Sequence, residues 1–94
     1  MELVCKLIAQ DELQEREYER EGVKEKFASM RLQFQRGQDT FYGEMVQETA
    51  RKAPRFALNT HYLVDMSVKG RKFESKDRRE MVENRVVVNR MVEF

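Results

Sequence analysis

The side chains most suited to nucleophilic chemistry are Cys5 and His61, the one cysteine and the one histidine of the chain. They lie far apart in the sequence, so a nucleophile and base pair would have to be assembled entirely by the fold. A zinc site needs three or four Cys or His ligands at recognisable spacing, and one of each cannot supply them. We therefore predict no catalytic residue and no metal ligand here. The lone cysteine also fits a reducing compartment.

Two other features resemble catalytic or phosphate-binding patterns. Carboxylates such as Glu17 and Glu21 lie in the most polar stretch of the chain, with no apolar surroundings to adapt them to acid or base catalysis. Gly37 and Gly43 flank a short loop, but the Gly-Lys-Ser/Thr ending of a phosphate loop is absent. We expect a protein that is not an enzyme and has no cofactor.

A basic cluster after residue 68 is the best nucleic-acid candidate. Several of its basic side chains could converge on a phosphate backbone while an aromatic ring stacks on a base. Glu74 and Asp77 interrupt the cluster, and the net charge of the chain is only +1. Nucleic-acid binding is therefore the alternative prediction, through Lys69, Arg71, Lys72, Phe73, Lys76, Arg78 and Arg79.

These residues must be positioned by the surrounding elements, and the longest pattern lies in residues 16–36. Val23, Phe27, Met30 and Phe34 are spaced four, three and four residues apart, which places them on one face of a helix. Gly37 ends this pattern, and Asp39 or Thr40 could cap a second helix over residues 40–52. The sequence thus predicts a helical hairpin.

An apolar stripe on a short chain needs a cover, and aromatic and methionine side chains suit adaptable interfaces. We therefore expect part of the hairpin surface to bind a partner protein, or a second copy of this chain. The predicted partner-binding residues are Val23, Phe27, Met30, Phe34, Phe41, Tyr42 and Met45.

After Pro54 the pattern changes to alternation. Apolar residues or Thr occupy every even position from 56 to 68, which favours a strand, although Gly70 would also suit the end of a helix. Lys69-Gly70 is expected to form a turn, with residues 71–74 returning as a short strand. The β-branched tail is expected to be a helix or a closing strand with Val86, Val88, Val92 and Phe94 on one side.

The chain has 94 residues, of which 40% are hydrophobic and 37% charged, so we expect one small domain spanning residues 1–94. The predicted class is α+β: a helical N-terminal half, with a long charged helix and a short one, then a small antiparallel sheet and a C-terminal helix or strand. The alternative is an all-α helical bundle.

No motif identifies a family, and no stretch is long and apolar enough to span a membrane. We expect a cytoplasmic interaction protein that acts through the helical hairpin and forms a homo-oligomer. It would be a small regulator, adaptor or inhibitor, of the kind that viruses and mobile elements encode.

Overall fold

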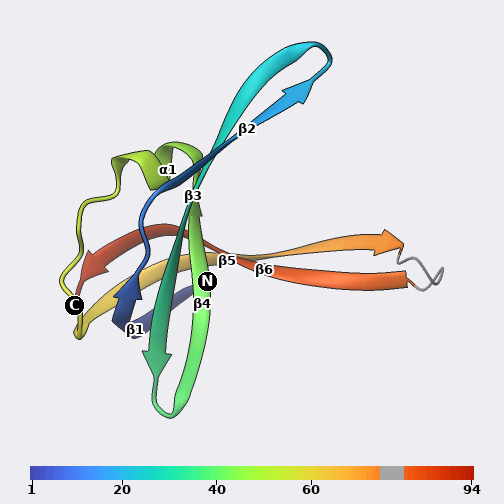
Figure 1. Ribbon diagram of the computed structural model, residues 1–94. Coiled ribbons are helices and arrows are strands. Elements are labelled where there is room, and N and C mark those ends of the chain that lie inside the picture. The colour runs from blue at the N-terminus through green and yellow to red at the C-terminus, as the bar shows by residue number, and fades with distance from the viewer. Residues whose placement is uncertain (75–79) are drawn as a thin grey trace.

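The chain folds into one six-stranded sheet with a single short helix among the described residues (Figure 1). The computed structural model describes the backbone of residues 1–74 and 80–94 and the side chains of residues 1–70 and 84–94. The predicted helical N-terminal half and the alternative helical bundle are therefore both wrong. The elements are β1 (Glu2–Gln10), β2 (Gln14–Arg20), β3 (Val23–Arg36), β4 (Asp39–Val46), α1 (Gln47–Lys52), β5 (Thr60–Glu74) and β6 (Glu80–Glu93).

β1 closes the sheet into a ring because it pairs with two strands. It is antiparallel to β5, with Cys5 opposite Tyr62, and then antiparallel to β3, with Gln10 opposite Leu32. A register shift between Leu7 and Ala9 marks the bend between these partners. β3–β4 and β5–β6 are antiparallel pairs, while β4 and β6 are parallel. The ring therefore runs β1, β5, β6, β4, β3 and back to β1.

β2 continues the course of β1 along β3, so the two behave as one interrupted strand. The N–H of Asp11 donates to the carbonyl of Arg31 at 2.9 Å between them, and Gln14 then pairs with Ser29. This strand order, with a helix between β4 and β5, is that of the OB-fold, a five-stranded Greek-key architecture. This fold hosts many unrelated functions, which depend on the residues of the individual site.

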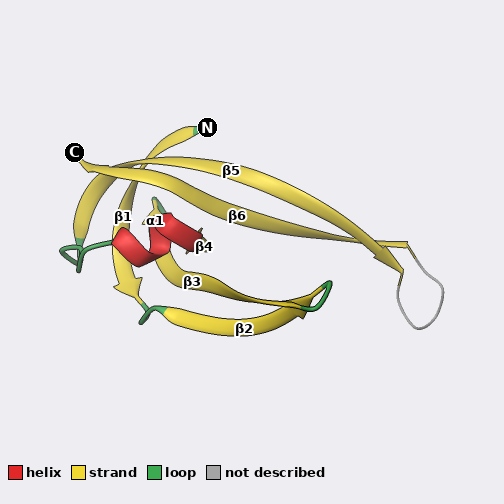
Figure 2. Ribbon diagram, turned by 90° about the horizontal axis from the view of Figure 1, so that it is seen from above, coloured by secondary structure: helices red, strands yellow, loops and turns green. Residues whose placement is uncertain are grey.

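Two hairpins extend from the same side of the ring (Figure 2). We call them the β2–β3 arm and the β5–β6 arm. The first turns at Glu21 and Gly22, whose φ angles of 53° and 79° suit the two-residue turn that joins twisted strands. In the second, β5 and β6 pair from Tyr62 and Glu93 outward to Glu74 and Glu80.

The core lies inside the ring and follows a period of two residues. Ala28, Met30, Leu32 and Phe34 of β3 are buried, while the residues between them point outward. Phe34 stacks on Phe41 of β4, with ring centroids 5.5 Å apart. The predicted helix over residues 16–36 is wrong. The alternating apolar residues 28, 30, 32 and 34 bury one face of a strand, whereas the helical spacing includes only residues 30 and 34 of these four.

The second half of the chain fits the prediction better. The expected strand over 56–68 is confirmed from Thr60 onward, and the tail is a strand rather than a helix. The turn expected at Lys69-Gly70 is wrong, because β5 continues through it. A register shift near Asn89 moves Met91 toward the core in place of Val92, which is 46% exposed.

α1 packs on β3 and β4 and buries Ala50. Its first residue, Gln47, has a positive φ of 53°, and its side-chain Oε1 accepts a hydrogen bond from the N–H of Ala28 at 3.2 Å. Because the β3–β4 pairing ends at Val46, this side chain extends the hydrogen-bond ladder by one position. Within the described part of the chain, no helix has the length and apolar character needed to cross a bilayer.

Candidate functional site

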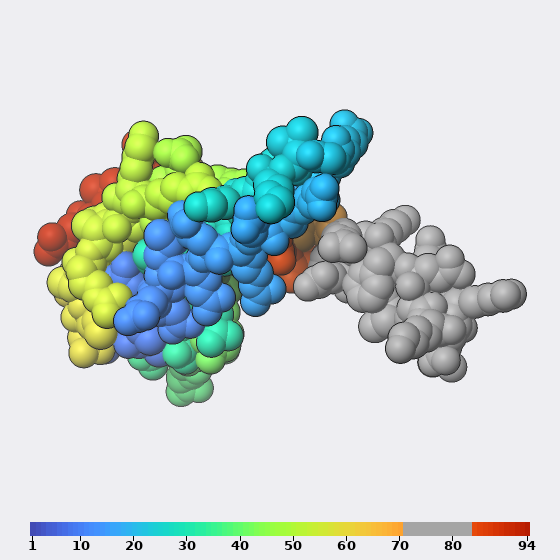
Figure 3. Space-filling view, turned by 45° about the horizontal axis from the view of Figure 1, so that its top comes forward, coloured from blue at the N-terminus to red at the C-terminus, as the bar shows by residue number. Residues whose placement is uncertain are grey.

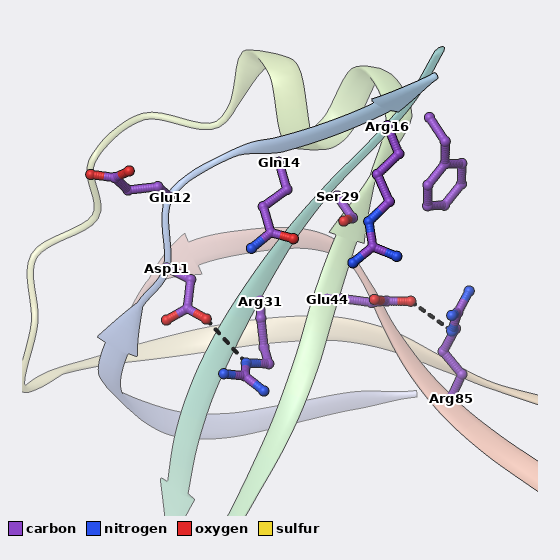
Figure 4. A pocket seen from close by; sticks show the side chains of 9 residues that line it. Asp11, Glu12, Gln14, Arg16, Ser29, Arg31, Glu44 and Arg85 are labelled. Carbon is purple, nitrogen blue, oxygen red and sulfur yellow. Dashed lines mark hydrogen bonds and ion pairs between the residues drawn. The ribbon is translucent and has the colours of Figure 1, made fainter. Parts of the chain in front are cut away.

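A groove lies over the outer faces of β2, β3 and β4 and reaches the near end of β6 (Figure 4). Its main part encloses about 340 Å³. An adjoining part of about 270 Å³ shares Arg31, Glu44 and Arg85 with it and extends to Tyr42. The main part is lined by Asp11, Glu12, Gln14, Arg16, Phe27, Ser29, Arg31, Glu44 and Arg85.

Alternation along β2 decides which charges face the groove. Gln14 and Arg16 line it, opposite Ser29 and Phe27 of β3, and the same face carries Tyr18 and Arg20 further along the strand. The other face of β2 carries only carboxylates, at Glu15, Glu17 and Glu19. The β2–β3 arm therefore presents arginine and aromatic side chains toward the groove.

The acidic face of the arm is matched on its own side. Glu17 pairs with Lys26 and Glu19 with Lys24 across the two strands, and opposite charges at such positions stabilise a hairpin. Glu15 forms an ion pair with Arg51 of α1 at 3.3 Å. These charges stabilise the arm and its contact with α1.

Three arginines enter the groove from three strands. Arg31 of β3 forms an ion pair with Asp11 at 3.1 Å, and its Cζ lies 4.8 Å from the ring centroid of Tyr42. The side chains of this ion pair are 62% and 45% exposed, so exchanging Asp11 for another anion costs little. Arg16 makes no ion pair or hydrogen bond with any residue that the structure describes.

Arg85 comes from β6, and its Nε lies 2.8 Å from Oε1 of Glu44. That Oε1 is buried, yet no donor among the described residues approaches it with the angle of a hydrogen bond. The contact is therefore an ion pair by distance, and this oxygen of Glu44 has no exposed surface of its own. Figure 4 shows Arg16 and Arg85 directed toward Glu44 from two sides.

Aromatic rings are spaced along the same face. Tyr42 is 55% and Tyr18 39% exposed, and Phe27 is half-buried in the groove wall. The hydroxyl of Tyr18 donates to Oε2 of Glu25 at 2.7 Å, and this bond raises the pKa of Tyr18 above its ordinary value. The ring stays neutral at physiological pH and offers a flat, uncharged surface.

The predicted partner-binding residues do not form one surface. Met30, Phe34 and Met45 lie in the core, and Phe41 is partly buried against them. The exposed members, Val23 at the start of β3 and Tyr42 on β4, belong to different parts of the sheet, with Phe27 in the groove. The helical hairpin and its apolar ridge therefore do not exist.

The predicted basic cluster is described only at its start. Lys69 is exposed on β5 and pairs with Arg85 in the β5–β6 register, so both lie on one face. The side chains of Arg71, Lys72, Phe73, Lys76, Arg78 and Arg79 lie outside the described residues.

Cys5 and His61 are brought to neighbouring positions but on opposite faces. Cys5 pairs with Tyr62 and points into the core, whereas His61 pairs with Lys6 and is exposed. Burial raises the pKa of the Cys5 thiol, although Arg36 acts in the opposite direction. Among the described side chains, those of residues 1–70 and 84–94, no three His, Cys, Asp or Glu gather in a way that could hold a metal ion.

Sequence reasoning missed Arg16, Arg31, Glu44 and Arg85. A signal was present: residues 28–35 alternate strictly between apolar and polar, which places Arg31 on the outer face of a strand. No comparable signal brings Arg85 to the groove, since that contact depends on the parallel β4–β6 pairing.

No protein-family model matches this chain, and no curated protein matches it either. The groove therefore carries the functional argument by itself.

Proposed function

We propose that this is a non-enzymatic protein that binds single-stranded nucleic acid in the groove over β2, β3 and β4. The observation that carries the proposal is the combination of Arg16, Arg31 and Arg85 with the exposed ring of Tyr42 on one continuous face. Proteins that bind single strands combine cationic grooves with aromatic rings on which bases stack. The corresponding face of the OB-fold is where oligonucleotides and oligosaccharides bind.

The charge distribution supports a local rather than a global attraction. With a net charge of +1, the whole molecule has little long-range attraction for a polyanion. Along β2, Arg16 and Arg20 lie on the groove face and the carboxylates of this strand lie on the other face. The groove lining as a whole holds three arginines and three carboxylates, so the attraction comes from Arg16 and its neighbours and not from a net positive charge. A strand can therefore meet cations in the groove without passing over the acidic face.

Single strands suit this groove better than duplexes. Stacking on Tyr42 needs an unpaired base whose face is accessible, and its ring is already bordered by the guanidinium of Arg31. A base placed against either group would gain stacking and cation–π contacts.

We propose a cytoplasmic location on the basis of the free thiol of Cys5.

The test is a titration of a labelled, mixed-sequence oligonucleotide of about 12 nucleotides by fluorescence anisotropy, as DNA and as RNA. We expect binding that weakens as salt rises, because bound phosphates displace counterions. Tyr42→Ala should weaken it by roughly 5-fold to 100-fold, the range of one lost stacking contact.

The matched pair of variants is Arg16→Glu and Lys24→Glu, which make the same charge change on opposite faces of one hairpin. Arg16→Glu should abolish most binding at moderate salt, while Lys24→Glu should change the dissociation constant by no more than about twofold. Equal damage from both variants, tighter binding to duplex than to single strand, or no binding at low salt would overturn the proposal.

A second candidate, a protein partner, is favoured by the outer edge of β2. All seven residues of this strand are exposed, and it is the end strand of the sheet. Figure 3 shows the β2–β3 arm projecting from the body of the molecule. An extended segment of another protein could add a strand there. A second copy of this chain fits poorly, since symmetric antiparallel pairing centred on Tyr18 sets Arg16 against Arg20 and Glu17 against Glu19.

A further inference from the structure

Glu44 is an unexpected residue for a groove that binds phosphates. Its side chain is 23% exposed, on the outer face of β4 and within the lining of both parts of the groove. A carboxylate repels phosphate oxygens, so it lowers the affinity of the groove for a nucleic-acid backbone. Groups that repel one ligand commonly serve to select another.

The carboxylate of Glu44 indicates which ligand group would fit. Its Oε1 is buried beside Nε of Arg85 at 2.8 Å, and the side chain as a whole is 23% exposed, so a ligand would meet the exposed part of this acceptor. Arg16 and Arg85 approach this carboxylate from either side (Figure 4). A ligand N–H group is therefore complementary to Glu44, because a carboxylate only accepts hydrogen bonds. A phosphate or a carbonyl group, which also only accepts, is not complementary.

The distance between Tyr42 and Glu44 indicates that the N–H donor belongs to a nucleobase. Tyr42 and Glu44 are two residues apart on the same face of one strand, which separates them by about 7 Å. That distance is similar to the width of a nucleobase. A base stacked against Tyr42 or Arg31 would therefore bring its edge to the carboxylate of Glu44.

We propose that Glu44 selects bases that carry an exocyclic amino group, so that the groove prefers cytosine or adenine over thymine or uracil at this position. The amino groups of cytosine and adenine donate to a carboxylate, whereas uracil and thymine place a carbonyl oxygen there. This inference rests on the proposed single-strand binding and adds a specificity to it. Glu44 is the specificity-determining residue, and Tyr42 holds the base.

The ligand pair that tests this is oligodeoxycytidine and oligodeoxyuridine of about 12 nucleotides, compared at neutral pH and low salt. The two share the pyrimidine ring and backbone, and at ring position 4 one has an amino group and the other a carbonyl. We expect the cytidine oligomer to bind wild-type protein at least about 5-fold more tightly. Replacing its bases with N4,N4-dimethylcytosine, which has no N–H donor, should remove the preference without any change to the protein.

The matched protein variants are Glu44→Gln and Glu12→Gln, which each remove one negative charge from the groove lining. Glu44→Gln should bring the ratio of the two affinities close to one, since an amide can donate to the uracil carbonyl. Glu12→Gln should strengthen binding of both oligomers alike and leave the ratio unchanged.

The outcomes separate this inference from the proposal beneath it. Equal binding of both oligomers to wild-type protein, or a ratio that survives Glu44→Gln, overturns the role of Glu44 and leaves single-strand binding intact. Failure of either oligomer to bind at low salt overturns single-strand binding itself.

Discussion

The closure of the ring depends on Gly43, and replacing it with alanine should destabilise the fold. Gly43 lies on β4 next to the parallel β4–β6 contact, which joins the two halves of the chain. A side chain at this position would point toward β6. A Cβ at this position would lie 2.9 Å from Cγ2 of Val88 and 3.4 Å from the ring of Phe34. Val88 and Phe34 are both buried, and a β-branched valine has little rotamer freedom with which to yield.

The expected cost is that of adding a methyl group to a filled core, about 1–3 kcal/mol. For a domain of this size, each kcal/mol lowers the melting temperature by roughly 4–8 °C. Gly43→Ala should show this loss in thermal and urea unfolding. Gly70→Ala is the control, since its Cβ would meet only Oδ1 of Asn84 at 3.7 Å, an ordinary contact distance.

The double variant Gly43→Ala/Val88→Ala tests the cause. Removing the Val88 methyl groups relieves the clash, so the two changes together should cost less than the sum of each alone. A Gly43→Ala protein as stable as wild type, or strictly additive costs, would show that β4 and β6 do not approach as closely as described.

Two further predictions concern buried groups. Gln47→Ala should lower the free energy of unfolding by about 1–3 kcal/mol in a urea titration, because it removes the acceptor for the N–H of fully buried Ala28. The nearby variant Thr49→Ala is the control and should be nearly neutral in the same titration. Burial raises the pKa of the Cys5 thiol above its ordinary value of 9.0, so the folded protein keeps a proton that the unfolded chain loses, and stability should fall as the pH rises past that value. Cys5→Ala should make this fall shallower; an unchanged slope would mean that Cys5 does not contribute to it.

The sequence predicts the second half of the fold better than the first for a physical reason. Residues 60–66 alternate between buried Tyr62, Val64 and Met66 and more exposed neighbours, and this pattern is specific to a strand. In the first half, residues 14–26 are rich in Glu, Lys, Arg and Gln, which are good helix formers. Their strands are held by pairing in a hairpin arm, a tertiary effect that overrides local preference.

The helical period also misplaces the charged side chains of β2, which form part of the site. In a helix, Arg16, Arg20 and Lys24 would share one face because they are four residues apart, whereas in the strand Arg16 and Arg20 share a face with Tyr18 and lie opposite the carboxylates. With the two-residue period of a strand, the residues of β2 and β3 that face the groove can be predicted from the sequence. The position of Arg85 cannot be predicted in this way, because it depends on the pairing of strands that are distant in the sequence.

Self-association loses its main support in this structure. The sequence predicts it because an apolar stripe that includes Phe27, Met30 and Phe34 is too broad for a short helical chain to cover. Met30 and Phe34 are buried by the chain's own strands, and Phe27 lines the groove. Light scattering across protein concentration would show whether another surface brings copies together.

The most direct test of binding in the groove uses the three tyrosines of the chain as reporters. Tyr18 and Tyr42 are 39% and 55% exposed on the groove face, and Tyr62 is 6% exposed in the core. Protein labelled with fluorotyrosine gives one fluorine NMR signal for each, assigned by Tyr→Phe variants. Adding a single-stranded oligonucleotide should shift the Tyr42 signal most, Tyr18 less, and leave Tyr62 in place; an unmoved Tyr42 signal at saturating ligand would contradict the account.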